Sequence, residues 1–600
     1  MQFFIKDNYY FDIDLQNQLR ITGPENHLFL GLTFPTTIPL EINDFGLEKG
    51  NLIVHLKIRT PELQIPIPIV TDIRTLRSHT EQVSPRPTYV ELIQQDIKEV
   101  MPQSIRSYTK NGRTFFEFSN TFIDDNGTKK KYGSIISFGS EYTGELAGKI
   151  IHIRGRSPIV ITIQTLTNIR VTQQLKKKVF SSSYLLPPEL FSPQLLKMYD
   201  QSQKYIEHLI RSKKTSSFEY GTIFPRDWIE SADLGLGDLS QETVDYMYGQ
   251  SLNHLSDTGE AWHENAIGEY KTKVKDATHH IDRKMIDIEP RYILGIKQVS
   301  KTFLTNQENQ HRLRLVASYI LKNAEEQELI SFKKLDNAET EEYHKVGNWR
   351  DSYYAYPRQK SPLSPYDVNC VFYPLSLRVI REFYQFFRIT DVQKLNQLIE
   401  KWDKQKDKFR LYHSGNLIGY SLALHGKKHL PLPSAHLDES YDLFYGTPSL
   451  EEIASFAEKI MDPNFFYTPV GPLLVDIDDD EFTTWHYHGK VIWPKQAAYA
   501  VAGLAKQFKR GLKEGWPWPV IETIKLAVIT TSEACFKGWT DMGGIVPELY
   551  YYDEEQKRAR LYTDQEKFEG QMSLIQLWSS VGARRIMQEY ASVNKIAEAV

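Results

Sequence analysis

Hydrophobic and polar residues alternate with the two-residue period of β-strands over about the first 180 positions of the chain. The run 51–58 begins apolar and then alternates, and 159–163 is rich in β-branched residues. Asn-Gly pairs at 111–112 and 126–127 stand between such runs, and the first of them is typical of a type I′ hairpin turn. Many short strands joined by regular turns predict a β-sandwich domain over residues 1–185.

The hydrophobic period changes to that of α-helices beyond a Ser/Pro-rich stretch at 181–188. Ser449 and Glu452 have the spacing of a capping box, and 495–512 and 565–590 are further helical stretches. We therefore expect an α+β multidomain chain, in which a helical linker at 186–215 leads to a catalytic helical toroid at 216–600. No internal repeat is evident, and long loops rich in aromatic residues are expected to carry the active site.

Composition and charge narrow the class of protein. The net charge of −4 provides no basic surface for nucleic acid. The two cysteines, Cys370 and Cys535, form neither a disulfide framework nor a metal-binding cluster. The first residues do not resemble a secretory signal, and no stretch approaches the roughly 18 apolar residues of a membrane span. We expect a cytoplasmic protein without membrane or nucleic-acid partners, and the oligomeric state stays open.

Three short segments carry the candidate chemistry. Gly-Asn-Trp-Arg-Asp at 347–351 and Gly-Gly-Ile-Val-Pro-Glu at 543–548 each end in a carboxylate, and 484–494 is a Trp/His cluster. Cleavage of a glycosidic bond needs two carboxyl groups, one that protonates the leaving oxygen and one that activates water or attacks the sugar. Aromatic rings suit the apolar faces of the sugar.

Each segment alone has an ordinary structural interpretation. Asp351 could be a helix cap or the salt-bridge partner of Arg350. His486 and His488 could bind a metal ion, but they lack a third ligand. Glu548 could be an ordinary residue at the end of a loop. The adjacent charges of an Arg-Asp pair at 226–227 are common on protein surfaces.

Taken together and in this order, the segments resemble the glucosidase part of glycogen debranching enzymes and, more distantly, glucoamylases. The resemblance covers roughly residues 195–590. It implies an (α/α)6 barrel after a β-sandwich, an inverting mechanism without metal or organic cofactor, Asp351 as general acid and Glu548 as general base. The side chains that it implies for substrate binding are Arg226, Asp227, Trp228, Asp287, Trp349, Arg350, Asp367, Asn369, Trp485, His486, His488 and Trp493.

We therefore expect a hydrolase that removes glucose from the ends of α-linked glucans. Burial against Trp349 should raise the pKa of Asp351, whereas an Arg350 guanidinium pointing at Asp351 would lower it. The alternatives are a hydrolase of another small α-glucoside, a phosphorylase on the same fold, and a non-catalytic glucan-binding protein. The acidic stretch 476–481 has no place in the family pattern, and we interpret it as a solvated loop.

Overall fold

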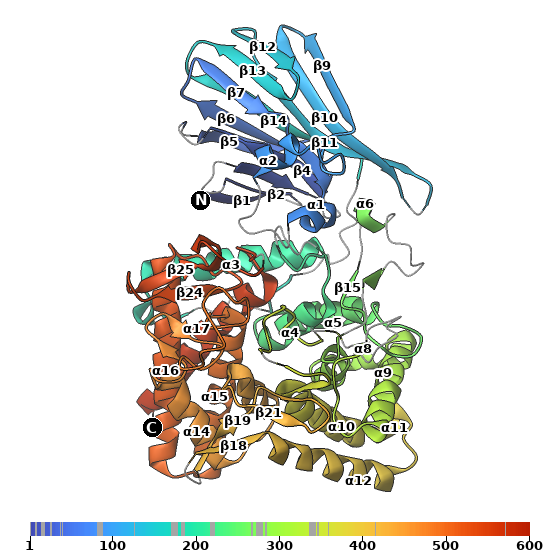
Figure 1. The fold of residues 1–600 in the computed structure, drawn as a ribbon, viewed down its shortest axis with the longest axis vertical. Helices are drawn as coiled ribbons and strands as arrows, with labels where there is room; N and C mark the ends of the chain where they lie inside the picture. Colours follow the sequence, from blue (N-terminus) through green and yellow to red (C-terminus); the bar gives the residue numbers. More distant parts are fainter. Residues whose placement is uncertain are drawn as a thin grey trace. The chain divides into compact units, whose positions relative to one another are not determined.

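The computed structural model describes residues 2–6, 9–13, 18–23, 27–35, 38, 40–80, 88–124, 126–169, 178–181, 186–216, 222–265, 268–271, 280–281, 285–334, 344, 347–357, 359–413, 416–570 and 572–599. The chain forms two compact units (Figure 1). The first comprises Met1–Gln174, His208–Thr222 and Ala266–His279, and the second comprises Leu175–Glu207, Ile223–Asn265 and His280–Val600. The sequence pattern gives no sign of the two segments that return to the first unit.

The first unit contains three antiparallel sheets. One has the order β1 (Gln2–Lys6), β2 (Tyr9–Ile13), β3 (Gln18–Thr22), β4 (His27–Thr33), β8 (Ile69–Asp72). The largest has the order β5 (Leu40–Glu48), β6 (Asn51–Ile58), β14 (Ile159–Thr167), β11 (Lys129–Phe138), β10 (Arg113–Ile123), β9 (Ser104–Lys110). The third has the order β12 (Tyr142–Ala147), β13 (Ile150–Gly155), β7 (Glu62–Pro66).

The alternating residues predicted from the sequence point to opposite faces of these sheets. Every second residue of β6 is buried, and Val54 and Leu56 belong to one apolar core that the sheets share. Asn111 and Gly112, with φ values of 51° and 73°, turn the chain between β9 and β10 as predicted. The predicted β-sandwich is confirmed.

Six helices of the second unit contact one another in a closed ring. They are α4 (Pro225–Leu234), α7 (Ile288–Leu294), α10 (Tyr373–Glu382), α13 (Ser440–Tyr445), α15 (Pro494–Glu514) and α17 (Leu577–Ala599). The π-helical turn η4 (Asp367–Phe372) connects α10 with α13, and α17 closes the ring against α4. The predicted (α/α)6 architecture is confirmed.

An outer layer of helices covers this ring. It contains α5 (Gln241–Leu252), α9 (Gln307–Glu326), α12 (Val392–Asp403), α14 (Leu450–Met461) and α16 (Trp518–Asp541), each in contact with a ring helix. The long helix α3 (Pro193–Arg211) joins them, because Arg584 of α17 donates to its Tyr199 carbonyl at 2.9 Å. Ser449 and Glu452 form the predicted capping box at the start of α14.

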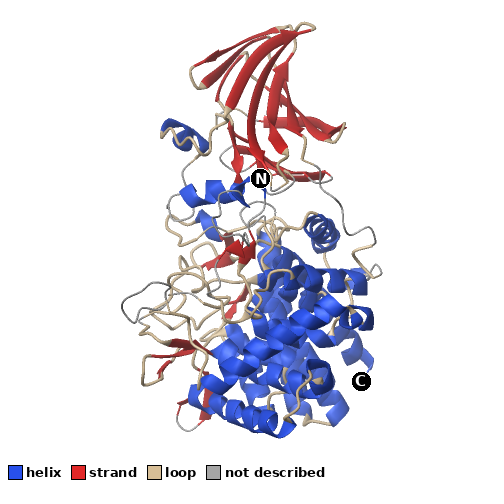
Figure 2. Cartoon of the chain, turned by 90° about the vertical axis from the view of Figure 1, so that its right-hand side faces the viewer, coloured by secondary structure: helices blue, strands red, loops and turns tan. Residues whose placement is uncertain are grey.

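Inner and outer helices alternate along the chain, so each outer helix returns the chain to the same end of the ring. The inner helices therefore run in one direction, and their N-terminal ends lie together. Pro225 and Pro494 begin two of them, where a missing backbone N–H costs nothing. Loops gather on one side of the helices in Figure 2.

The helix predicted over 565–590 is only partly correct, because α17 begins at Leu577. Residues 565–570 and 572–576 form turns and extended chain. The side chains of Gln565 and Glu569 bond to the loop that contains Thr484 and Tyr487, and the Gln576 side chain bonds to Asp227 of α4. These bonds take the place of a first helical turn.

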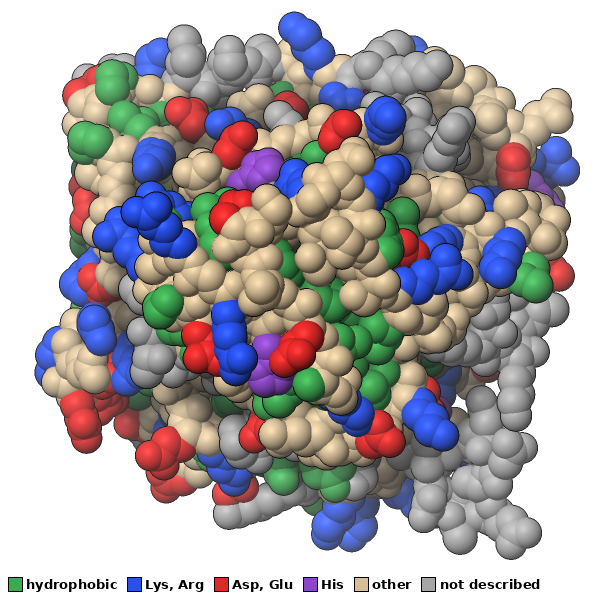
Figure 3. Space-filling model, turned by 90° about the horizontal axis from the view of Figure 1, so that it is seen from above, with side chains coloured by type: hydrophobic (Ala, Val, Ile, Leu, Met, Phe, Trp, Pro, Cys, Tyr) green, Lys and Arg blue, Asp and Glu red, His purple; other side chains and the backbone are tan. Residues whose placement is uncertain are grey.

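Charges of both signs are interspersed on the face shown in Figure 3, in keeping with 72 basic against 76 acidic residues. The helices within the described ranges include none with the length and apolar character that crossing a membrane requires.

Candidate active site

The predicted site residues gather at the N-terminal ends of the ring helices. Arg226 and Asp227 lie in the first turn of α4, and Asp287 immediately precedes α7. Trp493 immediately precedes α15, and Gln576 immediately precedes α17. Segments far apart in the sequence therefore meet at one end of the barrel.

Asp351 forms an ion pair with Arg226, and not with its neighbour in the sequence. Arg226 Nη2 donates to Asp351 Oδ2 at 2.7 Å, and His263 Nε2 lies 3.4 Å from the same oxygen. Burial alone would raise the pKa of Asp351, but Arg226 and His263 outweigh it and hold this pKa well below its ordinary value. The prediction of a raised pKa is therefore wrong for the free protein.

Arg350 points away from Asp351. Its Nε and Nη2 donate to the two carboxylate oxygens of Asp438 at 2.7 and 3.1 Å, and it also donates to the carbonyls of His488 and Leu474. The Arg350 side chain is fully buried, so this fork fixes the loop that carries Asp351. These contacts are structural, and the substrate contact assigned to Arg350 stays a prediction.

Asp227 and Asp287 offer buried oxygen atoms beside Arg226. Arg226 Nε lies 3.8 Å from Asp227 Oδ1, and its Nη1 lies 3.8 Å from Asp287 Oδ1. Within the described part of the chain, several buried polar atoms of the site take part in no hydrogen bond. They are Asp227 Oδ1, the two Asp287 carboxylate oxygens and Trp349 Nε1. Buried polar atoms normally have hydrogen-bond partners, and sugar hydroxyls would satisfy these.

Burial also changes how these carboxyl groups ionise. It raises the pKa of Asp227 to about 7, against the opposing effect of Arg226. It raises the pKa of Asp287 as well, although Arg226 and Arg291 oppose this. Near neutral pH the pocket therefore contains a carboxyl group that can hold a proton next to the ionised Asp351.

A fully buried charge network supports the pocket from below. Glu230 forms ion pairs with Arg291 Nη2 at 2.7 Å and with Lys495 Nζ at 2.9 Å. Burial would raise the pKa of Glu230, but these two cations bring it below its ordinary value. Lys495 Nζ also lies 3.8 Å above the Trp349 ring and 4.2 Å above the Trp578 ring. The sequence patterns did not point to Glu230, Arg291 or Lys495.

The tryptophan cluster forms an aromatic wall. The His488 and Trp493 rings are stacked at 5.0 Å, and Trp349 meets both edge-on at 5.3 and 5.7 Å. Trp493 Nε1 donates to the Tyr487 carbonyl at 3.0 Å, and His488 Nδ1 lies 2.8 Å from Ser352 Oγ. Burial lowers the pKa of His488 well below its ordinary value, so this ring is neutral.

His486 faces other neighbours. Its ring is stacked on Tyr354 at 5.0 Å, and its Nδ1 lies 3.3 Å from the Thr483 amide. The rings of His486 and His488 therefore do not converge on a common ion.

Residues 565–576, here called the bracing segment, tie the loops of the site together. Glu569 accepts from the amides of Tyr354 and Tyr487, both at 2.8 Å. Gln565 exchanges hydrogen bonds with Thr484 at 2.7 and 3.0 Å. The Trp/His loop is thereby fixed beside the loop that carries Asp351.

The same segment positions the second predicted carboxylate. The Ser573 amide donates to Glu548 Oε2 at 2.8 Å, and the Glu548 amide donates back to the Ser573 carbonyl. Three residues later, Gln576 Nε2 donates to Asp227 Oδ2 at 3.0 Å. One short segment therefore connects Glu548 with the Asp227–Arg226–Asp351 cluster.

Three other residues predicted to bind substrate, Asp367, Asn369 and Trp228, have structural contacts instead. Asn348 Nδ2 donates to both Asp367 oxygens at 3.0 and 3.1 Å. Asn369 bonds to the backbone of Ile330 and Pro365, and Trp228 is fully buried. Their substrate contacts stay predictions.

The acidic stretch 476–481 forms turns in which Asp478 and Asp480 are exposed and the other residues are half-buried. Asp476 accepts from the Asp478 amide, and Asp479 accepts from the Glu481 amide, both at 3.0 Å. The solvated-loop interpretation fits the two exposed residues only.

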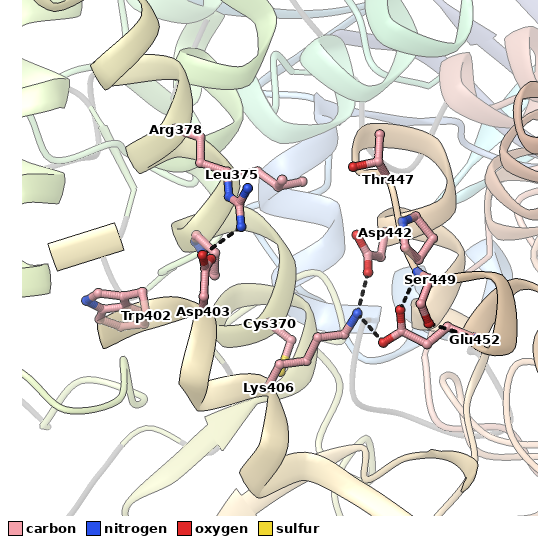
Figure 4. A pocket seen from close by; sticks show the side chains of 12 residues that line it. Cys370, Leu375, Arg378, Trp402, Asp403, Lys406, Asp442, Thr447, Ser449 and Glu452 are labelled. Carbon is pink, nitrogen blue, oxygen red and sulfur yellow. Dashed lines mark hydrogen bonds and ion pairs between the residues drawn. The ribbon is translucent and has the colours of Figure 1, made fainter. Parts of the chain in front are cut away.

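A cavity of about 300 Å³ lies beside η4 and is lined by Cys370, Trp402 and Lys406 (Figure 4). Lys406 is held between Asp442 and Glu452 at 2.7 Å each. Its charged groups are paired with one another and none of the predicted site residues lines it, so this cavity is not the candidate site.

No protein-family model matches the sequence, and no curated protein matches it. Among solved structures, it is similar to a mannosylglycerate hydrolase of glycoside hydrolase family 63 from Thermus thermophilus in complex with glucose. The identity is 10% and the TM-score 0.43, over 65% of this chain and 99% of that chain.

Two rhamnosidases are also similar. The enzyme from Klebsiella oxytoca with rhamnose bound aligns at 9% identity and a TM-score of 0.42, over 80% of this chain and 88% of that chain. The family 78 enzyme from a Bacillus species aligns at 10% identity and 0.45, over 92% of this chain and 47% of that chain. The function proposed below rests on this chain's own side chains.

Proposed function

We propose that this protein is an inverting glycoside hydrolase that releases glucose from the ends of α-linked glucans or oligosaccharides. The observation that supports the proposal is that residues 572–576 bond both to Glu548 and to Asp227, which lies beside the Arg226–Asp351 ion pair and its buried carboxylate oxygens. Indole rings lie in the same loops. Sugar hydroxyls suit the buried oxygens, and the apolar face of a sugar suits the rings.

In the proposed reaction, Glu548 takes a proton from a water molecule whose oxygen attacks the anomeric carbon. The bond between that carbon and the glycosidic oxygen breaks, and the proton of Asp351 passes to the leaving oxygen. In a complex with a sugar, the two carboxyl groups should lie about 6.5–9.5 Å apart, as an inverting mechanism requires.

Asp351 needs a proton for this step, and its pairing with Arg226 opposes protonation. We infer that substrate binding draws Arg226 toward Asp227 and Asp287, each already 3.8 Å away. Once Arg226 moves, the largest opposing effect is lost and burial shifts the pKa of Asp351 upward toward the protonated form, with His263 as the remaining opposing group. The same motion would bring the guanidinium to the hydroxyls of the bound sugar, the role predicted for Arg226.

The test compares Asp351→Asn with Glu548→Gln on a panel of isomaltose, maltose, panose and limit dextrin. Loss of general acid or base catalysis should lower turnover by about 10²–10⁴-fold in either variant. α-Glucosyl fluoride needs little protonation, so it should rescue Asp351→Asn far more than Glu548→Gln. Near-normal turnover of a natural substrate by either variant would refute the assignment of that residue.

The same panel separates the alternatives. Turnover that requires added phosphate would indicate a phosphorylase, against which the presence of Glu548 argues. Binding of sugars without turnover would indicate a non-catalytic glucan-binding protein.

A further inference from the structure

Four aromatic side chains form a cluster next to Asp351, here called the aromatic platform: Tyr353, Tyr354, Trp485 and His486. Tyr354 is stacked on His486 at 5.0 Å and 14°, and it meets Trp485 edge-on at 5.2 Å. Tyr353 meets Tyr354 at 5.0 Å and 73°. Two loops therefore contribute rings to one continuous surface with an L-shaped corner.

The two tyrosines of the platform are exposed, whereas Trp485 is half-buried and His486 is buried. The exposed fractions of Tyr353 and Tyr354 are 55% and 43%. Both tyrosines follow within three residues of Asp351, whose side chain is 24% exposed. Neighbouring exposed aromatic rings of this kind are typical of binding surfaces.

The platform is also held in place before any ligand arrives. Glu569 fixes the Tyr354 amide, and its other oxygen fixes the Tyr487 amide between His486 and His488. Lys567 Nζ lies 3.6 Å above the Trp485 ring and steadies it from the bracing segment. A surface that is rigid in advance loses little entropy when it binds.

Its chemistry combines apolar faces with polar edges. Burial and the nearby Lys567 lower the pKa of His486 to about 4, so the ring is uncharged at neutral pH. The tyrosine hydroxyls and the Lys567 ammonium supply hydrogen-bonding groups at the rim. An apolar C–H face bordered by hydroxyl groups is the complementary surface, and a pyranose ring has both.

We propose that the aromatic platform binds the leaving group of the substrate and that this leaving group is a sugar ring. The inference rests on the proposed hydrolase function, in which Asp351 contacts the glycosidic oxygen. The leaving group must then lie on the solvent side of Asp351, where Tyr353 and Tyr354 follow it along the chain. The substrates are accordingly di- and oligosaccharides, and glucosides of small non-sugar groups are turned over less efficiently.

The experiment measures kcat/KM for panose and for α-glucosyl fluoride, whose leaving group is too small to reach the platform. The ratio of the two values should fall about tenfold in Tyr353→Ala and in Tyr354→Ala, the size of effect expected from one lost ring contact. Tyr354→Phe keeps the ring and should keep the ratio. Tyr412→Ala is the matched control, because Tyr412 is 57% exposed and lies outside the platform.

A ratio within twofold of wild type in the Tyr353→Ala/Tyr354→Ala double variant would overturn the proposal. If the wild type turns over neither substrate, the hydrolase assignment fails separately, and calorimetric binding of panose then decides the platform. Weaker panose binding by the double variant would support a sugar-binding platform. Equal binding, or none by the wild type, would refute it.

Discussion

Replacing Arg226 by glutamine removes the cation that holds Asp351 in its ionised form. The guanidinium nitrogen lies 2.7 Å from Asp351 Oδ2. An opposite charge at this range lowers a carboxyl pKa by about 1–3 units, and each unit corresponds to about 1.4 kcal/mol. The Asp351 side chain is 24% exposed, so solvent screens the ion pair and we use only the lower part of that range, about 1–2 units. This corresponds to a pair energy of about 1.4–2.7 kcal/mol.

The pH dependence of this energy has a definite sign. The folded-state pKa of Asp351 is depressed, so the ion pair stabilises the fold above the unfolded-state pKa of about 4. The contribution is lost as the pH falls from there through the folded-state pKa. The stability deficit of Arg226→Gln should therefore be largest at neutral pH and shrink in acid. The attraction between Arg226 and the carboxyl groups of Asp227 and Asp287 also weakens in acid, because these groups then become protonated.

A double-mutant cycle isolates the pair from these other terms. It combines Arg226→Gln with Asp351→Asn and compares unfolding free energies in urea at pH 7 and near pH 3. We expect a coupling energy of about 1.4–2.7 kcal/mol at pH 7 and a smaller one in acid. A coupling below about 0.5 kcal/mol at pH 7, or one that does not change with pH, would refute the ion-pair account of Asp351.

Two further substitutions test the buried charges. Because the folded-state pKa of Asp227 is raised to about 7, the protein should lose stability as the pH rises from about 4 to about 7. Asp227→Asn should reduce this loss, and urea unfolding across that pH range measures it. Arg350→Ala leaves Asp438 buried without its fork and should cost about 3–5 kcal/mol in unfolding free energy. The control Arg154→Ala breaks an exposed pair with Glu62 and should change the unfolding free energy far less, because solvent screens this pair. Equal costs would contradict the assignment of Arg350 as a buried anchor.

The fold was predictable wherever its signals are local. The alternation of β6, the Asn-Gly turn at 111–112 and the capping box at Ser449 each depend on a few neighbouring residues, and all three were confirmed. The bracing segment has a helical sequence pattern but is not helical. Its polar side chains bond to residues far away in the sequence, and hydrophobic periodicity does not reveal such contacts.

The sequence predicted which carboxylates belong to the candidate site, but it did not predict which cation each of them pairs with. Adjacency in the sequence suggested Arg350 as the partner of Asp351, whereas the partner is Arg226, 125 residues away. Arg350 is drawn instead to Asp438. His263 next to Asp351 follows from no local pattern, because the two residues lie on loops 88 residues apart in the sequence that meet only in the folded chain.

The closure of the ring also determines when the site can form during synthesis of the chain. Asp227 and its partner Gln576 are 349 residues apart, and α17 must be made before it can pack on α4. At about 5–20 residues per second, a ribosome needs roughly 17–70 s to make the chain between them. During that interval the Asp227 carboxyl lacks the partner that fixes it, and Glu548 and its partner Ser573 are made only near the end of it. Catalytic competence should therefore appear only at the end of synthesis, as a single late event.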